Sequence, residues 1–353
     1  MKNTTKTPEL NDTEISFARV SFGKRLVRTK AFPLFVLLIV AIAVFAILSP
    51  MRNDGFQAFF RVKTIWRVLQ DFAVTGFLAI GVGLLIVSGN IDLSSATVGS
   101  MGGVIIAVMI SWYNIPWGWA IVTALGVAVL VGFINGFLVN ELKQPPFIAT
   151  MAMSTILTAV MQIIATDKTG QINGSISFSH EAYAEIALSK VFGEINVVSL
   201  VMVLCFVVYG LALSKSKFGR TLYLMGGNSS AAHLAGVNAK ATTYFLFVNA
   251  SVLGSIAGIV NSSRVMSGST MALMNSQFSG MTAAILGGIS FGGGSGGMGG
   301  AFLGLLVIQT FNMGMATSGG SPYLTPVLSG ALLLVALTFD YFNTRAQNKR
   351  VGA

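Results

Sequence analysis

Long stretches of this chain carry no charged side chain, and these stretches limit what the chain can fold into. The longest extends from Val265 to Phe339 without one Asp, Glu, Lys or Arg. Only 10% of all residues are charged, whereas about 25% are charged in an ordinary soluble domain. Hydrophobic residues make up 54% of the chain. This pattern indicates a protein that lies in a membrane.

The uncharged stretches also predict how often the chain crosses the membrane. A helix needs about 20 apolar residues to span the hydrocarbon of a bilayer. The eighth predicted crossing is short for a full span and is expected to be broken or tilted. A β-barrel would show short alternating segments, and the sequence shows none, so we predict an all-α fold with about ten transmembrane helices. We expect these helices at 31–50, 66–88, 94–113, 117–140, 146–166, 195–214, 241–263, 278–291, 298–317 and 323–342.

The distribution of Lys and Arg predicts the orientation. An even number of crossings places both termini on one side of the membrane. Of the 22 Lys and Arg residues, fifteen then lie on the side of the termini and seven on the opposite side. Because cytoplasmic loops carry the excess of positive charge, we expect both termini and the loop at 215–240 in the cytoplasm. This asymmetry explains most of the net charge of +10, which therefore does not indicate nucleic-acid binding.

These observations divide the chain into three parts. We expect a basic cytosolic segment at 1–30, a transmembrane domain at 31–343 that contains the loop at 215–240, and a cytosolic tail at 344–353. Residues 15–30 mix apolar with basic side chains. Such a segment either lies along the lipid surface or only orients the first span.

Glycines recur four residues apart at three places in the predicted helices. Small residues at this spacing allow two helices to approach closely in lipid. We interpret them as packing faces, which say little about a substrate. The pairs are Gly132 with Gly136, Gly254 with Gly258, and Gly300 with Gly304.

Polar side chains within the apolar stretches are candidates for a substrate path. Asp92 is the one acid near predicted membrane sequence in mid-chain, but together with Ser94 and Ser95 it equally suits the cap of a helix beginning near Leu93. Each uncharged candidate suits helix packing as well as binding. As a set, amides with few charges favour a neutral hydrophilic substrate over an ion. The uncharged candidates are Asn90, Gln162, Asn249 and Gln277, with Gln309 and Asn312 as further polar groups in the spans.

The chain offers no recognisable catalytic site. It lacks the glycine-rich phosphate loop with its following Lys, so we expect no ATP binding by this chain. Two histidines and one cysteine make a metal site of His and Cys ligands improbable. We therefore predict a protein that is not an enzyme and that itself binds neither a cofactor nor a metal.

The loop at 215–240 contains a short helix with both ends marked. Asn228 or Ser229 can cap the free N–H groups at its start, and Gly236 can adopt the left-handed backbone that ends it. A helix of about two turns is marginal alone in water, so we expect it to pack against another surface. On the cytosolic face of a membrane protein, it indicates a contact for a soluble partner.

Four motifs follow one another between about residues 65 and 341. The most specific is Phe218-Gly219-Arg220, followed by Gly226-Gly227-Asn228, Ala231-Ala232 and Gly236-Val237-Asn238. The others are residues 283–291 with 293–296, residues 146–150, and residues 91–94 with 98–100. In their order along the chain, these motifs resemble the permease subunits of bacterial ABC importers for monosaccharides, a group that includes the ribose and galactose permeases.

The resemblance implies a coupling helix, which inserts into a cleft on the ATP-binding subunit. It further implies two permease subunits, an ATPase dimer that holds ATP and Mg²⁺, and an external receptor for the sugar, either periplasmic or a lipoprotein. The chain departs from the family pattern at Gln277 and Ser279, where such permeases often carry two acids. That departure leaves the substrate and the choice between an identical and an unlike second permease open. The residues that would form the coupling element here are Gly226, Gly227, Asn228, Ala231, Ala232 and Gly236.

The expected function is therefore that of an inner-membrane permease passing a monosaccharide or related polyol inward by alternating access. Membrane lipids, the ATPase, the receptor and a second permease are the expected partners. Two alternatives remain. One is the same architecture carrying a nucleoside or a branched-chain amino acid, and the other is a sugar carrier that works without nucleotide.

Overall fold

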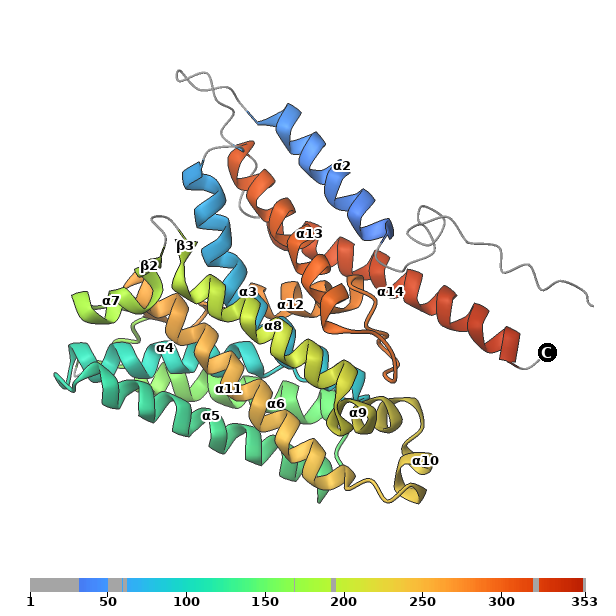
Figure 1. The fold of residues 1–353 in the computed structure, drawn as a ribbon. Coiled ribbons are helices and arrows are strands. Elements are labelled where there is room, and N and C mark those ends of the chain that lie inside the picture. Colours follow the sequence, from blue (N-terminus) through green and yellow to red (C-terminus); the bar gives the residue numbers. More distant parts are fainter. Residues whose placement is uncertain are drawn as a thin grey trace, which may run out of the picture.

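The computed structural model describes residues 32–49, 59, 62–167, 169–191, 195–319 and 324–351, and the predicted basic segment at 1–30 lies outside them. Nearly all of the described chain is helical (Figure 1). The helices are α2 (Phe32–Leu48), α3 (Val62–Val87), α4 (Ser95–Ser111), α5 (Trp117–Asn140), α6 (Pro146–Ile164), α7 (Glu181–Leu188), α8 (Val197–Lys215), α9 (Lys217–Gly227), α10 (Ser229–Leu234), α11 (Ala239–Val265), α12 (Met274–Leu286), α13 (Met298–Thr317) and α14 (Leu324–Val351).

Each of the ten predicted crossings coincides with one of these helices. Among the described residues, α5, α6, α8, α11 and α13 are long and apolar enough to cross a membrane, and three shorter apolar helices lie in α2, α3 and α4. The helix at the eighth predicted crossing, α12, has only 13 residues. It is about 20 Å long and cannot span about 30 Å of hydrocarbon, as predicted. Helix α14 continues to Val351, well into the predicted tail.

Helix α11 forms the centre of the bundle. It packs against α3, α4, α5 and α7, and 67% of its most apolar stretch is buried, against 28% in α6 and in α8. One hydrophobic cluster joins α11 to α3, α8, α12 and α13, and a second joins it to α4, α5 and α6. The outer helices keep apolar side chains exposed, including Leu130 on α5, Ile156 on α6 and Leu204 on α8, as helices in contact with lipid do.

The three glycine pairs lie where helices approach one another, as predicted. On α11, a Cβ at Gly254 would lie 2.1 Å from the Ser95 carbonyl oxygen of α4, and a Cβ at Gly258 would lie 1.8 Å from that of Gly99. The pair on α5 packs in the same way on α11, and the pair on α13 packs on α12. No side chain fits between backbones this close, so glycine is required there.

The structure also contains elements that we did not predict. Two small antiparallel sheets pair β1 (Ser175–Ser177) with β4 (Ser267–Ser269) and β2 (Lys190–Val191) with β3 (Ile195–Asn196). Within the loop at 215–240, α9 forms before α10. Ser216 caps α9 by accepting the Gly219 N–H at 3.2 Å, and α9 buries Leu222 while Lys217 is exposed. Its three glycines and two basic residues made this segment resemble a loop.

Candidate functional site

A cavity of about 620 Å³ opens among α3, α11, α12, α13 and α14. Small-molecule sites in proteins have volumes of about 300–1,000 Å³, so a ligand of that class fits. The lining combines aliphatic residues and one aromatic ring with amides, hydroxyls and two charged groups. Its polar and aromatic residues are Asp71, Thr75, Asn261, Arg264, Asn275, Ser276, Phe278, Ser279, Gln309 and Asn312.

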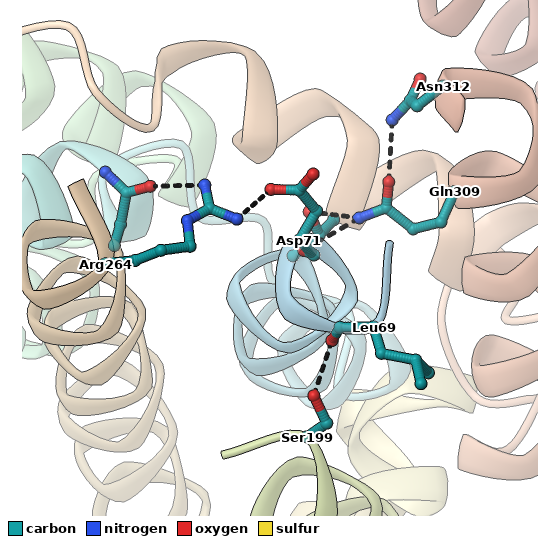
Figure 2. A network of polar contacts seen from close by, with 8 residues as sticks. Leu69, Asp71, Ser199, Arg264, Gln309 and Asn312 are labelled. Atoms are coloured by element: carbon teal, nitrogen blue, oxygen red, sulfur yellow. Dashed lines mark hydrogen bonds and ion pairs between the residues drawn. The ribbon is translucent and has the colours of Figure 1, made fainter. Parts of the chain in front are cut away.

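Asp71 and Arg264 are the only charged groups among the described residues that line the cavity. Figure 2 shows that they form an ion pair, from α3 to α11, between Nη1 of Arg264 and Oδ1 of Asp71. Nη2 of Arg264 also donates to Oδ1 of Asn261 at 3.3 Å, one turn earlier on α11. Because the two charges neutralise each other, the cavity presents no net charge to a ligand.

A chain of amides continues this network toward α13 (Figure 2). Nδ2 of Asn312 donates to Oε1 of Gln309 at 3.0 Å, and Nε2 of Gln309 donates to the Asp71 carbonyl oxygen at 3.0 Å and to Thr75 Oγ1 at 3.1 Å. Asn312 and Gln309 lie three residues apart on α13, and Asp71 and Thr75 lie four apart on α3, so each pair shares a helix face. These contacts orient several donors and acceptors toward one space.

The five residues predicted for a substrate path lie elsewhere. Asn90 donates to Ser88 Oγ at 2.9 Å, Asn249 accepts the Tyr209 hydroxyl, and Gln162 is exposed on α6. None of them lines the cavity. Their role in a path stays a prediction.

Asp92 and Gln277, the other two of the five, meet at the start of α4. The carboxylate of Asp92 is buried and accepts the Ser94 N–H at 2.7 Å, the Ser94 hydroxyl at 2.6 Å and the Ser95 hydroxyl. The N-cap residue of α4 is Ser94, which makes no side-chain capping bond. Gln277 accepts the Ala96 N–H at 2.9 Å and donates to the Asp92 carbonyl oxygen at 2.8 Å. The Gln277 side chain therefore holds the start of α4 against α12, whereas the Asp92 carboxylate bonds only its neighbours Ser94 and Ser95.

Sequence reasoning singled out neither Asp71 nor Arg264. We counted Arg264 only among the Lys and Arg residues on the side opposite the termini, and we did not consider Asp71, although it lies within the crossing predicted at 66–88. A signal was nevertheless present, because an ionisable residue within membrane sequence is a functional candidate and Asp71 lies well inside α3. Gln309 and Asn312 were recognised as polar, but the sequence did not indicate that they face the same space.

The second candidate region is the short helix α10, whose two predicted ends are confirmed. Asn228 caps it by accepting the Ala231 N–H at 2.9 Å. At the other end Gly236 has φ +74°, while its N–H bonds the His233 carbonyl at 3.0 Å and the Val237 N–H bonds that of Ala232 at 3.1 Å. This pair of bonds is a Schellman motif, which satisfies carbonyls at the end of the helix.

The faces of α10 differ sharply. Ala232 is 1% exposed, so this side of the helix packs within the chain, whereas the Leu234 side chain is 87% exposed. Leu234 therefore lies on the outer face of α10, opposite the side that packs within the chain. Leu234 was not among the predicted site residues, since its position on the outer face follows only from how α10 packs.

Gly226 and Gly227 belong to α9 and not to α10. They lie in a contact among three chain segments that we call the glycine junction, defined by Gly89, Gly226, Gly227, Gly293 and Gly294. The Gly294 N–H donates to the Val87 carbonyl oxygen at 2.8 Å, and a Cβ at Gly226 would lie 2.0 Å from that oxygen. The end of α9 therefore rests directly on the backbone at the end of α3 and on the turn between α12 and α13.

The junction lies at the end of α3, and the cavity lies about midway along this helix. Sixteen residues separate Asp71 from Val87, which is about 24 Å along a helix. Helices α12 and α13 also reach both places, because each lines the cavity and the turn between them enters the junction. Helix α9 therefore contacts α3 and the α12–α13 turn, which belong to elements that also line the cavity.

Comparison with known proteins identifies the kind of protein that this is. The family described as "Branched-chain amino acid transport system / permease component" matches residues 64–337. The chain is 30% identical over 313 residues to the fructose import permease of Rhizobium meliloti, covering 88% of this chain and 84% of that protein. The chain belongs to the sugar-permease family of bacterial ABC importers.

Other relatives of this permease have related names. It is 30% identical over 333 residues to the L-arabinose transport system permease of Escherichia coli, covering 93% of this chain and 94% of that protein. It is 29% identical over 306 residues to the ribose import permease of Bacillus subtilis, covering 87% and 91%. No solved structure matches it significantly.

Membership in this family has three direct consequences. The permease is a multi-pass membrane subunit of a bacterial ABC importer. It is not itself the catalyst, and the family implies ATPase and binding-protein partners. The substrate, the orientation and the roles of individual residues do not follow from membership.

Proposed function

We propose that this permease passes a neutral monosaccharide through the cavity described above, across the bacterial inner membrane and into the cell. The observation that carries the proposal is the lining of the cavity, in which amides and hydroxyls lie among apolar residues and the two charges neutralise each other. A sugar offers several hydroxyls and no charge, so it can bond these groups without leaving an ion unpaired. Phe278 adds an apolar ring, against which the C–H face of a sugar can pack.

A branched-chain amino acid suits this cavity less well. Its zwitterion carries a carboxylate and an ammonium group, and each needs an opposite charge or several donors in place. The charges at hand, Arg264 and Asp71, already bond each other. Binding a zwitterion would first break that ion pair. The sugars in the names of the relatives support the same choice.

The proposed orientation follows the distribution of Lys and Arg. Both termini and the segment containing α9 and α10 face the cytoplasm, and the cavity lies nearer the outer surface, with α7 and the strands β2 and β3 at the end of the bundle away from α10 (Figure 1). A receptor delivers the sugar outside, and an ATPase dimer binds ATP with Mg²⁺ inside. The other partners are a second permease copy, identical or unlike, and membrane lipids.

We expect uptake to need the complete importer. The permease, its receptor and its ATPase are reconstituted in liposomes and supplied with radiolabelled ribose, arabinose, xylose and fructose. Accumulation of one of these sugars against a gradient, only with ATP present, is the expected result. The permease alone should neither hydrolyse ATP nor concentrate sugar.

Two results would contradict this. Gradient-driven sugar uptake by the permease alone indicates a carrier independent of nucleotide. Selection of a branched-chain amino acid or a nucleoside by the receptor, with matching uptake, assigns the same architecture to another substrate.

Helix α10 is the proposed contact with the ATPase, and Leu234 is its sharpest test. Leu234→Glu should reduce ATPase stimulation by the receptor and sugar at least tenfold, because a charge replaces the apolar side chain that a cleft on the ATPase would bury. Leu234→Met, which keeps an apolar side chain of similar volume, is the matched control and should retain stimulation. The measurement is ATP hydrolysis by the reconstituted importer.

Because the Leu234 side chain is exposed, neither substitution should change the amount or the thermal stability of the permease. The buried Ala232 is a poorer test, since Ala232→Glu would also disturb packing within the chain. Equal stimulation by the Glu and Met variants would exclude Leu234 from the contact.

A further inference from the structure

A second cavity, of about 440 Å³, lies between α8 and α13 and extends to α9; we call it the α8–α13 groove. None of its lining residues is charged. It contains two hydroxyls, of Ser214 and Tyr223, and the Tyr223 hydroxyl already donates to the Gly296 carbonyl oxygen at 2.6 Å. Its walls are therefore apolar. The lining residues are Val203, Phe206, Val207, Gly210, Leu211, Leu213, Ser214, Tyr223, Gly297, Met298, Gly299 and Phe302.

The groove exists because glycines replace side chains along it. A Cβ at Gly299 or at Gly297 would meet no heavy atom within 4 Å, and a Cβ at Gly210 would only touch that of Met298, at 3.5 Å. The space in front of these glycines is open. On the α8 side, Val207 and Leu211 border it with exposed side chains.

The position of the groove restricts its occupant. Helices α8 and α13 are both long and apolar enough to cross the membrane, so most of the groove lies at the depth of the lipid chains. At that depth an apolar space suits an acyl chain, which adapts to its shape.

Basic residues stand at the cytoplasmic end of the groove. Lys215 lies four residues after Leu211, so it continues the row of α8 side chains that forms the wall. Arg220 lies three residues before Tyr223 on α9, and Lys217 begins that helix. All three are exposed, and neither α8 nor α9 contains an acidic residue. Clusters of Lys and Arg beside the cytoplasmic surface of a membrane attract anionic lipids.

We propose that the α8–α13 groove binds an anionic phospholipid. One acyl chain lies along Val203, Val207 and Leu211, and the phosphate meets Lys215, Lys217 and Arg220. The chain fills the space that the glycines leave open, while the positive charges select the headgroup. A lipid held there contacts the start of α13 and α9 together, next to the glycine junction.

Native mass spectrometry of the permease, purified in detergent with added phosphatidylglycerol or phosphatidylcholine, tests the proposal. We expect retention of phosphatidylglycerol at least tenfold above that of phosphatidylcholine. Gly299→Leu, which fills the groove, and the triple substitution Lys215→Gln, Lys217→Gln and Arg220→Gln should each lower retained phosphatidylglycerol at least tenfold. The two sets of substitutions act on different parts of the lipid.

Two variants serve as matched controls. Gly126→Leu places the same side chain on α5, at a glycine that also has no heavy atom within 4 Å of its Cβ, and Lys143→Gln removes another exposed cation. Both should retain lipid as the unaltered permease does. Unchanged retention by Gly299→Leu, or equal retention of the two lipids, would overturn the proposal. A third result would also overturn it: the Gly299→Leu complex keeps its lipid but loses a second permease copy. That result would assign the groove to the contact between two permeases.

Discussion

Replacing Gly226 with alanine is expected to reduce ATP-driven uptake at least tenfold, whereas the same change at the neighbouring Gly227 is expected to have little effect. Both residues end α9 and lie in the glycine junction, but only at the first would an added Cβ collide with other backbone. A Cβ at Gly226 would lie 2.0 Å from the Val87 carbonyl oxygen and 2.4 Å from the Gly294 nitrogen, whereas a Cβ at Gly227 would lie 3.9 Å from its nearest neighbour. Backbone atoms cannot rotate aside as a side chain can, so α9 must move off the end of α3 and the turn between α12 and α13.

The cost of the Gly226 substitution should resemble that of overpacking a core, about 1–3 kcal/mol, and 1.4 kcal/mol is a factor of ten. If α9 transmits force from α10 to the cavity, ATP hydrolysis by the importer should continue while uptake falls. Uptake and hydrolysis are measured on the same proteoliposomes. Thermal stability of each variant shows whether folding is the cause.

Gly227→Ala is the control, because it adds the same methyl group one residue further on. Equal uptake by the two variants would show that the junction does not need close contact at Gly226. A loss of uptake and hydrolysis in parallel would instead indicate that the junction only holds the fold together.

Breaking the ion pair in the cavity should reduce sugar uptake about tenfold for either single substitution, Asp71→Asn or Arg264→Gln. Each substitution leaves one charge beside the substrate without its partner. That charge must then bond water, or a substrate hydroxyl that otherwise bonds another group in the cavity. The Asp71 side chain is 48% exposed, so solvent screens the loss, and hydrogen bonds to charged groups contribute about 1.5–3 kcal/mol before that screening.

The double variant separates charge from shape. Asp71→Asn combined with Arg264→Gln leaves a neutral cavity of similar shape, so its uptake should exceed that of both single variants. If the double variant instead lost as much uptake as the two single variants together, the proposal that the cavity must be neutral would be contradicted. Such a cycle isolates the interaction between the two groups.

A second ion pair supplies the control. Lys240 and Glu141 bond at 2.8 Å on the surface, with side chains 59% and 38% exposed, and neither lines the cavity. Glu141→Gln should change uptake less than twofold. Loss of uptake in this variant as well would mean that any broken ion pair disturbs the permease.

The sequence alone determined most of the fold. Uninterrupted apolar stretches fixed the ten helices, because each membrane helix bonds its own backbone and needs no partner to form. The capped helix at Ser229–Leu234 was equally visible, since Asn228 and Gly236 act on neighbouring residues. The glycines four residues apart marked where helices would touch, although not which helix each would meet.

Tertiary structure alone decided which polar groups share the cavity. Asp71, Arg264 and Gln309 lie far apart in sequence, and only the packing of α3, α11 and α13 makes them neighbours. The packing of α10 likewise turned Ala232 inward and left Leu234 exposed. A sequence pattern predicts the hydrogen bonds that a helix makes within its own backbone, because these bonds join residues about one turn apart. Which faces of two helices meet depends on how all of them pack, and that is a property of the whole bundle.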